Sequence, residues 1–301
     1  MRILIPVDGS SFSDSAVNFV ASRKMLVQNH PEVELVNVQH PVSARVGRAA
    51  GKEMVDRYQA SEASKVIKPC VATLKRAGVI AQTNCLIGLP GPTVGKIAFE
   101  HDADLIVMGS HGHTGFKNVL FGSVTNAVLA SCSTPLLVLR DVLIIKKDSL
   151  HIGIALDGGK YDVAAAKFVI KHRDLFGAEP SITLMHVVPD IQNLVIPGFL
   201  GKNLMPGLEP AQVEAMQRGA FEMALAAPQK LFKAAGLSVQ EARLIGNNPG
   251  DAIANFAKQA KLDLVVLGSH GRGALLSVTL GSVSTRVAAK CRKPLLLIRK
   301  P

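Results

Sequence analysis

Short apolar runs alternate with longer amphipathic stretches along the whole chain. Arg2–Val7 is an apolar run without alternation, which is typical of a strand covered on both faces of a sheet, and Val33–Val38 is predicted as a second strand. Between them, Ser13–Val27 carries apolar residues at helical spacing, and Ser11 or Ser13 is its predicted N-cap. This alternation predicts an α/β fold with a parallel sheet between two layers of helices. Further elements are predicted as helices at Gly51–Ala77, Pro92–His101 and Val119–Ser131, and as strands at Val79–Ile87, Leu105–Met108 and Leu136–Leu139.

The chain contains one sequence pattern twice. Residues 104–140 and 263–299 align without a gap at a constant offset of 159 positions. The segments Arg2–Asp8 and His151–Asp157 align at an offset of 149. A repeat that covers most of the chain indicates two copies of one domain. The length of 301 residues agrees, because it is about twice the usual length of a domain.

The second copy is longer than the first between these aligned segments. Pro189–Pro210 is rich in Gly and Pro and shows no strand or helix period, so we expect the extra residues to form a loop there. A second loop is expected between Pro41 and Gly51. We place the two tandem domains at residues 1–145 and 146–301.

Each copy has glycine and serine residues directly after its fourth predicted strand. Gly109-Ser110-His111-Gly112 is followed nine residues later by Gly122-Ser123, which opens a helix. Gly268-Ser269-His270-Gly271 and Gly281-Ser282 repeat this spacing. Glycine lets the backbone approach a ligand closely, and the N–H groups at a helix start attract anions. The alternative is that the glycines only form turns and the serines only cap helices, but the same spacing in two copies favours a phosphate cradle.

The pattern G-2x-G-9x-G-[ST] after an aliphatic strand, with Val7-Asp8-Gly9-Ser10 near the N-terminus, resembles the ATP-binding class of universal stress proteins. The segments Pro135–Arg140 and Pro294–Arg299 fit the closing strand of that family. The resemblance covers nearly the whole chain. It implies two tandem Rossmann-like domains of the adenine nucleotide alpha hydrolase type, each with a five-stranded parallel sheet of order 3-2-1-4-5. It also implies that the two domains pair through their fifth strands, as a dimer within one chain that could itself dimerise.

The resemblance further implies which residues hold the nucleotide, ATP with Mg²⁺ (or Mn²⁺) on its phosphates. The backbone of Val38 would hold the adenine, and Asp8 would lie near the phosphates and their metal ion. In the first copy the assigned residues are Pro6, Val7, Asp8, Val38, Met108, Gly109, Gly112, Gly122, Ser123, Val124 and Thr125. In the second copy they are Asp157, Val187, Leu267, Gly268, Gly271, Gly281, Ser282, Val283 and Ser284.

The two copies differ at the turn after the first strand. The first reads Asp8-Gly9-Ser10-Ser11, whereas the second reads Asp157-Gly158-Gly159-Lys160 and lacks both hydroxyl groups. In addition, Ala155 stands where the first copy has Pro6. We therefore expect the first copy to hold the better nucleotide site and the second site to be weaker or changed in ligand.

Asp8 and the histidines of the glycine turn have other interpretations. A carboxylate at a strand end also caps the helix that follows, and this role is compatible with a Mg²⁺ contact. His111 and His113 form an HxH pair that would suit zinc. The second copy has His270 but Arg272 at these places, so phosphate or loop contacts are favoured over a dedicated metal site.

Several enzyme signatures are absent from the sequence. Gly91–Ile97 is one residue short of a P-loop and ends in Ile, and no GxSxG motif occurs. Asp157–Asp162 weakly resembles the SGGxDS loop of ATP pyrophosphatases but lacks both serines. Nucleotide binding without rapid turnover is therefore favoured, and slow ATP hydrolysis or adenylyl transfer is the alternative.

The net charge of +11 favours anionic partners. The charge is spread along the chain, and aromatic residues make up only 4% with no Trp, which disfavours a surface that stacks single-stranded bases. A nucleic-acid-binding module is thus a third hypothesis behind nucleotide binding. The four cysteines show no CxxC spacing and are expected as buried reduced thiols: Cys70, Cys85, Cys132 and Cys291.

The apolar runs are too short to span a membrane, and the N-terminus does not read as a signal peptide. We therefore expect a cytoplasmic protein. Together these observations predict a nucleotide-dependent regulator or sensor of the stress response. In this hypothesis, loops order over bound ATP and a regulatory protein partner recognises the ordered state.

Overall fold

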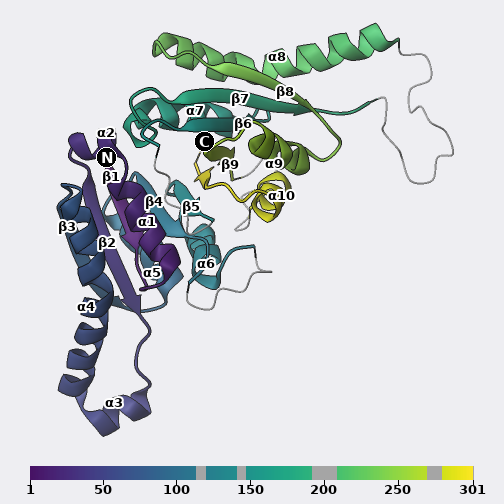
Figure 1. Cartoon of the computed structure of the whole chain (residues 1–301). Coiled ribbons are helices and arrows are strands. Elements are labelled where there is room, and N and C mark those ends of the chain that lie inside the picture. The colour runs from purple at the N-terminus through teal and green to yellow at the C-terminus, as the bar shows by residue number, and fades with distance from the viewer. Residues whose placement is uncertain (113–119, 141–146, 192–208, 270–279, 301) are drawn as a thin grey trace, which may run out of the picture.

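The computed structural model describes residues 1–112, 120–140, 147–191, 209–269 and 280–300 (Figure 1). Within them, the strands form a single sheet of order β3-β2-β1-β4-β5-β10-β9-β6-β7-β8. Neighbouring strands are parallel except for the central pair β5–β10. The α/β fold is confirmed. In the described part of the chain, the five-stranded sheets of the two halves join through the β5–β10 pair into one sheet of ten strands. The strands are β1 (Arg2–Pro6), β2 (Glu32–Gln39), β3 (Ala81–Ile87), β4 (Leu105–Gly109), β5 (Leu136–Leu139), β6 (His151–Leu156), β7 (Ser181–Val188), β8 (Gln240–Ile245), β9 (Leu264–Gly268) and β10 (Leu295–Ile298).

Helices cover both faces of the sheet (Figure 1). One apolar core lies under α1, α4, α7 and α8, and the second lies under α5, α6, α9 and α10. Because both faces are covered, β4, β5 and β10 are buried at every position. The helices are α1 (Ser11–Ala21), α2 (Lys24–Gln28), α3 (Ala44–Ala50), α4 (Lys52–Arg76), α5 (Pro90–Glu100), α6 (Ser123–Ser131), α7 (Lys160–Lys171), α8 (Pro210–Ala234), α9 (Pro249–Gln259) and α10 (Ser282–Lys290), with a short 3₁₀ helix at Arg173–Leu175.

Two arginines at equivalent positions, Arg140 and Arg299, hold the halves together beside the antiparallel strands. Arg140 donates to the carbonyl oxygen of Leu120 at 2.7 Å in its own half and to that of Ala288 at 2.6 Å in the other half. Arg299 donates to the carbonyl oxygen of Leu129 in the first half. Ala288 and Leu129 lie in the last turns of α10 and α6, where a cation is favoured by the helix dipole. Each half therefore stabilises the end of a helix in the other.

The helix predicted at Ser13–Val27 is wrong in its bounds. It is two helices, α1 and α2, and the N-cap of α1 is Ser10, which accepts a hydrogen bond from the backbone N–H of Ser13. The break follows from the burial of Arg23, which is 1% exposed and donates to the carbonyl oxygen of Lys147 at 2.7 Å. A side chain held in this way by a distant segment redirects the chain between the two helices.

Three other expectations are corrected. The helix predicted at Val119–Ser131 begins only at Ser123, and Val119 itself lies outside the described residues. The loop expected between Pro41 and Gly51 contains α3. Cys85 is exposed on the edge strand β3, whereas the other three cysteines are buried as predicted. Most of the predicted loop at Pro189–Pro210 lies outside the described residues, and α8 begins at Pro210.

In the part of the chain that the structure describes, no helix combines the length and the hydropathy needed to cross a membrane.

Candidate functional site

The predicted nucleotide residues of each half gather at the carboxyl ends of the central strands, where parallel sheets of this kind bind ligands. In the first half, β1 and β4 lie side by side, and α6 begins directly beside the end of β4. The N–H of Gly122 donates to the carbonyl oxygen of Ser110 at 2.7 Å and fixes this position. The N–H of Gly281 makes the same bond to Ser269 at 2.8 Å in the second half.

Side chains at the glycine turn of the first half would meet close neighbours. A Cβ atom at Gly112 would lie 2.6 Å from Oδ2 of Asp8, and one at Gly122 would lie 3.3 Å from Cα of His111. The other carboxylate oxygen of Asp8 accepts a hydrogen bond from the N–H of Ser10 at 2.9 Å. Asp8 therefore shapes the turn after β1 and also faces the glycine turn after β4, so the structure brings these two predicted segments together.

Among the residues that the structure describes, no side chain caps the helices α6 and α10. Their N-caps are Gly122 and Gly281, both in extended conformation. In α6 the N–H groups of Ser123, Val124 and Thr125 have no acceptor among the described residues. Such a helix start, with its positive dipole end, suits a phosphate.

The hydroxyl groups at the third position of these helices have a structural role. The hydroxyl of Thr125 is buried and donates to the carbonyl oxygen of Gly109 at 3.1 Å. Ser284 donates to the carbonyl oxygen of Gly268 at 2.7 Å in the same way. Both bonds tie the helix to the preceding strand end. Contacts from Thr125 or Ser284 to a phosphate would therefore come from the backbone N–H.

The remaining predicted residues of the first half also lie at this edge of the sheet. Pro6 ends β1, and Val7 follows it with its N–H bonded to the carbonyl oxygen of Val36 at 2.9 Å. Val38 is half-buried near the end of β2, and Met108 is buried near the end of β4. Their roles toward a nucleotide stay predictions.

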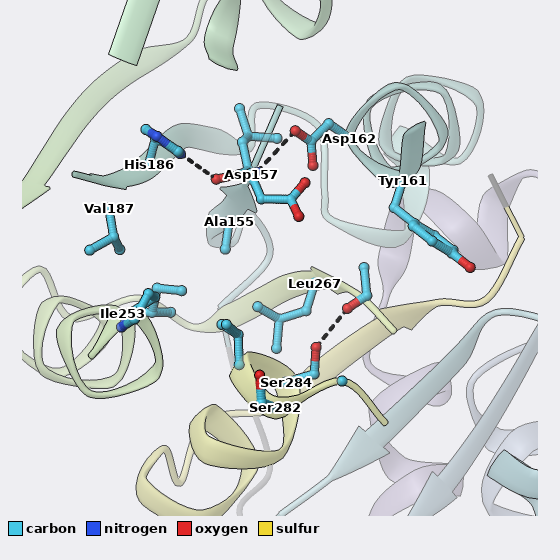
Figure 2. Close-up of a pocket in the computed structure, with 15 residues that line it drawn as sticks. Ala155, Asp157, Tyr161, Asp162, His186, Val187, Ile253, Leu267, Ser282 and Ser284 are labelled. Carbon is cyan, nitrogen blue, oxygen red and sulfur yellow. Dashed lines mark hydrogen bonds between the residues drawn. The ribbon is translucent and has the colours of Figure 1, made fainter. Parts of the chain in front are cut away.

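A cavity of about 170 Å³ lies at the equivalent place in the second half (Figure 2). Figure 2 shows Asp157, Asp162 and Tyr161 on one side of it and Leu267, Ser282 and Ser284 on the other. Gly271 lies outside the described residues. All the other residues predicted for the second half line the cavity: Asp157, Val187, Leu267, Gly268, Gly281, Ser282, Val283 and Ser284.

Seven further residues line this cavity that were not predicted as site residues from the sequence: Ala155, Leu156, Tyr161, Asp162, His186, Pro249 and Ile253. His186 is held by a hydrogen bond of 2.7 Å between its Nδ1 and the carbonyl oxygen of Leu156. For Asp162 a signal was present, because at the offset of 149 it aligns with Ser13. An acidic residue that replaces a serine in one copy only was a candidate for a changed site.

Asp162 is buried, and its carboxylate turns back onto the loop after β6. Its Oδ2 accepts the N–H of Asp157 at 3.0 Å and that of Gly158 at 2.6 Å. Burial, and next the nearby carboxylate of Asp157, raise the pKa of Asp162 to about 7. The hydrogen bonds to the loop act in the opposite direction but do not outweigh burial.

This raised pKa predicts a pH-dependent stability that Asp162→Asn removes. Between pH 4 and 7 the folded protein holds a proton on Asp162 that the unfolded chain has released, so stability is highest at low pH and falls as pH rises through 7. The expected contribution is roughly 4 kcal/mol. Urea unfolding of both proteins at pH 4 to 8 measures it as a difference curve. Parallel curves for the two proteins would contradict the burial of this charge.

The sequence profile of the Universal stress protein family matches residues 1–140 and 150–299. A universal stress protein from Mycolicibacterium smegmatis is 28% identical over 309 residues, which cover 99% of this chain and 96% of the relative. The crystal structure of a universal stress protein from Archaeoglobus fulgidus shares the fold with a TM-score of 0.68 at 21% identity, and the match covers 100% of this chain and 98% of that chain. A structure from Arabidopsis thaliana with AMP bound is 12% identical, covers 46% of this chain and 90% of that chain, and has a TM-score of 0.34.

The family profile thus matches both halves of the chain, and the relative from Mycolicibacterium smegmatis is matched along nearly its full length. The chain belongs to the universal stress protein family and carries two copies of its domain in tandem.

Proposed function

We propose that this chain binds ATP, with Mg²⁺ (or Mn²⁺) on its phosphates, in the crevice of the first half. The observation that carries the proposal is the start of α6, where the N–H groups of Ser123, Val124 and Thr125 have no acceptor among the described residues. They lie beside the turn at Gly112, where a side chain would displace the carboxylate of Asp8. Backbone N–H groups at such a place bind phosphate oxygens.

The residues present fit the proposed ligand. The Cβ atoms that glycine lacks at Gly112 and Gly122 would narrow the cradle in which the phosphates would lie. Asp8 offers a carboxylate oxygen on the same side, and hard oxygen ligands suit Mg²⁺. Bound Mg²⁺ would neutralise part of the phosphate charge. Val38, near the end of β2, would offer its backbone to the adenine.

The proposed activity is regulatory. Gly122, Ser123 and the residues after them would hold the phosphates, Asp8 would orient their metal ion, and a protein partner in the cytoplasm would recognise the nucleotide-bound form. The sequence presents no recurring general base at the glycine turns apart from the aspartates and histidines already named. Binding without rapid turnover follows. Release of inorganic phosphate or pyrophosphate at a steady rate would instead support the alternative activity, slow ATP hydrolysis or adenylyl transfer.

The test is to denature the purified protein and count the released nucleotide per chain, for wild type and Gly122→Asp. Asp is a favourable N-cap, so the variant should keep α6 folded while its carboxylate competes with the phosphates. We expect about one ATP per wild-type chain and at least tenfold weaker binding in the variant. The matched control Gly281→Asp, at the equivalent residue of the second half, should leave this ATP in place. Equal nucleotide content in wild type and Gly122→Asp would refute the proposal.

A further inference from the structure

The second half carries its own anion where the first half has a hydroxyl group. In the first half, the hydroxyl of Ser13 donates to the carbonyl oxygen of Ser10 at 2.9 Å, within the cap of α1. Asp162, at the equivalent position, points instead to the turn after β6. The turn that Asp162 contacts, Asp157–Lys160, is also the one whose sequence differs from that of the first copy.

The Asp162 carboxylate lies in a turn of the kind whose N–H groups bind anions. Successive N–H groups next to a residue with positive φ form a concavity that binds anions. Gly158 has a φ of +78°, and its N–H and that of Asp157 both point at Oδ2 of Asp162. A carboxylate of the protein therefore satisfies the donors that a ligand anion would use.

A second carboxylate stands next to this one. Asp157 holds its place through a bond of 2.8 Å from the N–H of Gly159 to its Oδ1, and it lines the cavity together with Asp162. Lys160, at the first position of α7, is exposed and does not line the cavity; its ammonium lies over the ring of Tyr161, 5.7 Å from the ring centre. The end of the cavity near β6 is thus acidic, although the chain as a whole is strongly basic.

The rest of the cavity suits an uncharged ring system. Its other lining is largely apolar, from Ala155, Val187, Ile253 and Leu267, with the ring of Tyr161 at one side. The imidazole of His186 adds a polar edge and is already oriented by the carbonyl oxygen of Leu156. Apolar walls with a few placed polar groups are typical of a small-molecule site.

We infer that Asp162 determines the specificity of the second crevice: it excludes the polyphosphate of ATP and leaves the crevice to an uncharged adenine nucleoside. The inference rests on the proposed function, because it assigns the second site its own ligand class. Asp157 has the place that Asp8 has in the first half, and Asp162 adds a carboxylate that the first half lacks. Above pH 7, where Asp162 has lost its proton, a phosphate brought beside it meets a like charge in a partly buried place, whereas a nucleoside brings no charge. The same chain would then hold one triphosphate and one nucleoside.

The experiment uses the full chain with Gly122→Asp, so that only the second crevice can bind. Calorimetric titration at pH 8 with adenosine and with Mg-ATP should show adenosine bound at least tenfold more tightly. Asp162→Ser, which copies the first half, should raise the affinity for Mg-ATP at least tenfold and leave adenosine within threefold. Asp162→Asn, which keeps the size of the side chain and removes its charge, should act in the same direction.

The reciprocal variant tests the same idea in the first half. Ser13→Asp in an otherwise wild-type chain should lower the ATP content of the first crevice, while Ser15→Ala, a nearby change in the same helix, should not. Equal affinities for Mg-ATP and adenosine, or no change in Asp162→Ser and Asp162→Asn, would overturn the inference while ATP in the first half still stood. If wild type bound neither ligand in either half, the proposed function and the inference would both fail.

Discussion

Arg140→Ala is expected to lower the free energy of unfolding by about 3–5 kcal/mol. The guanidinium group donates to Leu120 at 2.7 Å and to Ala288 at 2.6 Å, and hydrogen bonds from a charged donor contribute about 1.5–3 kcal/mol each. Alanine would leave both carbonyl oxygens without this donor and would also remove the guanidinium from above the ring of Phe121, 5.1 Å away. Since one bond crosses between the halves, we also expect the two halves to unfold in separate steps.

Denaturant unfolding followed by circular dichroism measures both effects. Arg299→Ala, at the equivalent position, should behave alike because its side chain donates to the carbonyl oxygen of Leu129 across the same boundary. The control is Lys24→Ala, which removes an exposed ion pair with Asp148 and should change stability by less than about 1 kcal/mol. A single sharp transition at the wild-type position in Arg140→Ala would show that the arginines do not hold the halves together.

Gly91→Ala is expected to destabilise the first half by roughly 3 kcal/mol and to weaken ATP binding. A Cβ atom at Gly91 would lie 2.2 Å from Cβ of Ala127, so α5 and α6 would have to move apart. The N-terminus of α6 provides the proposed phosphate donors, and a shift of that helix would carry them out of place. Thermal unfolding and nucleotide content, measured on the same sample, test the two parts of this prediction.

A matched glycine provides the control. Gly219 lies inside α8, and a Cβ atom there would meet nothing within 4 Å. Gly219→Ala should therefore stabilise the protein by up to about 1 kcal/mol, because alanine has the higher helix propensity. If Gly91→Ala were as well tolerated as Gly219→Ala, the close contact between α5 and α6 would not constrain the site.

The local pattern of apolar residues was enough to predict an element where that element is buried evenly along its length. Leu136–Leu139 could be assigned as a strand because every residue is apolar and buried. The break between α1 and α2 could not be predicted in this way. It depends on Arg23 reaching Lys147, a contact between residues 124 positions apart. The start of α6 is similar, because the N–H of Gly122 binds Ser110 and the chain before Ser123 stays out of the helix.

The residues of the candidate site likewise fall into those that the sequence predicted and those that it did not. Gly109, Gly112 and Gly122 were evident because backbone requirements repeat in both copies at one spacing. Asp162 was not, since its importance comes from where its side chain points and from the burial that raises its pKa to about 7. Neither property is encoded by spacing. Aligning the two copies residue by residue would have marked the position, but the serine and the aspartate both occur at helix starts for ordinary reasons.

The antiparallel pairing of β5 with β10 has an evolutionary consequence. Two identical subunits joined by a twofold axis must present the same pocket twice, so any substitution is copied into both. In this chain the two halves are encoded by separate stretches of one sequence, so each can be substituted alone. The backbone also links them covalently, so they stay paired one to one at any dilution. One pocket can then drift toward a new chemistry while its twin keeps the ancestral task.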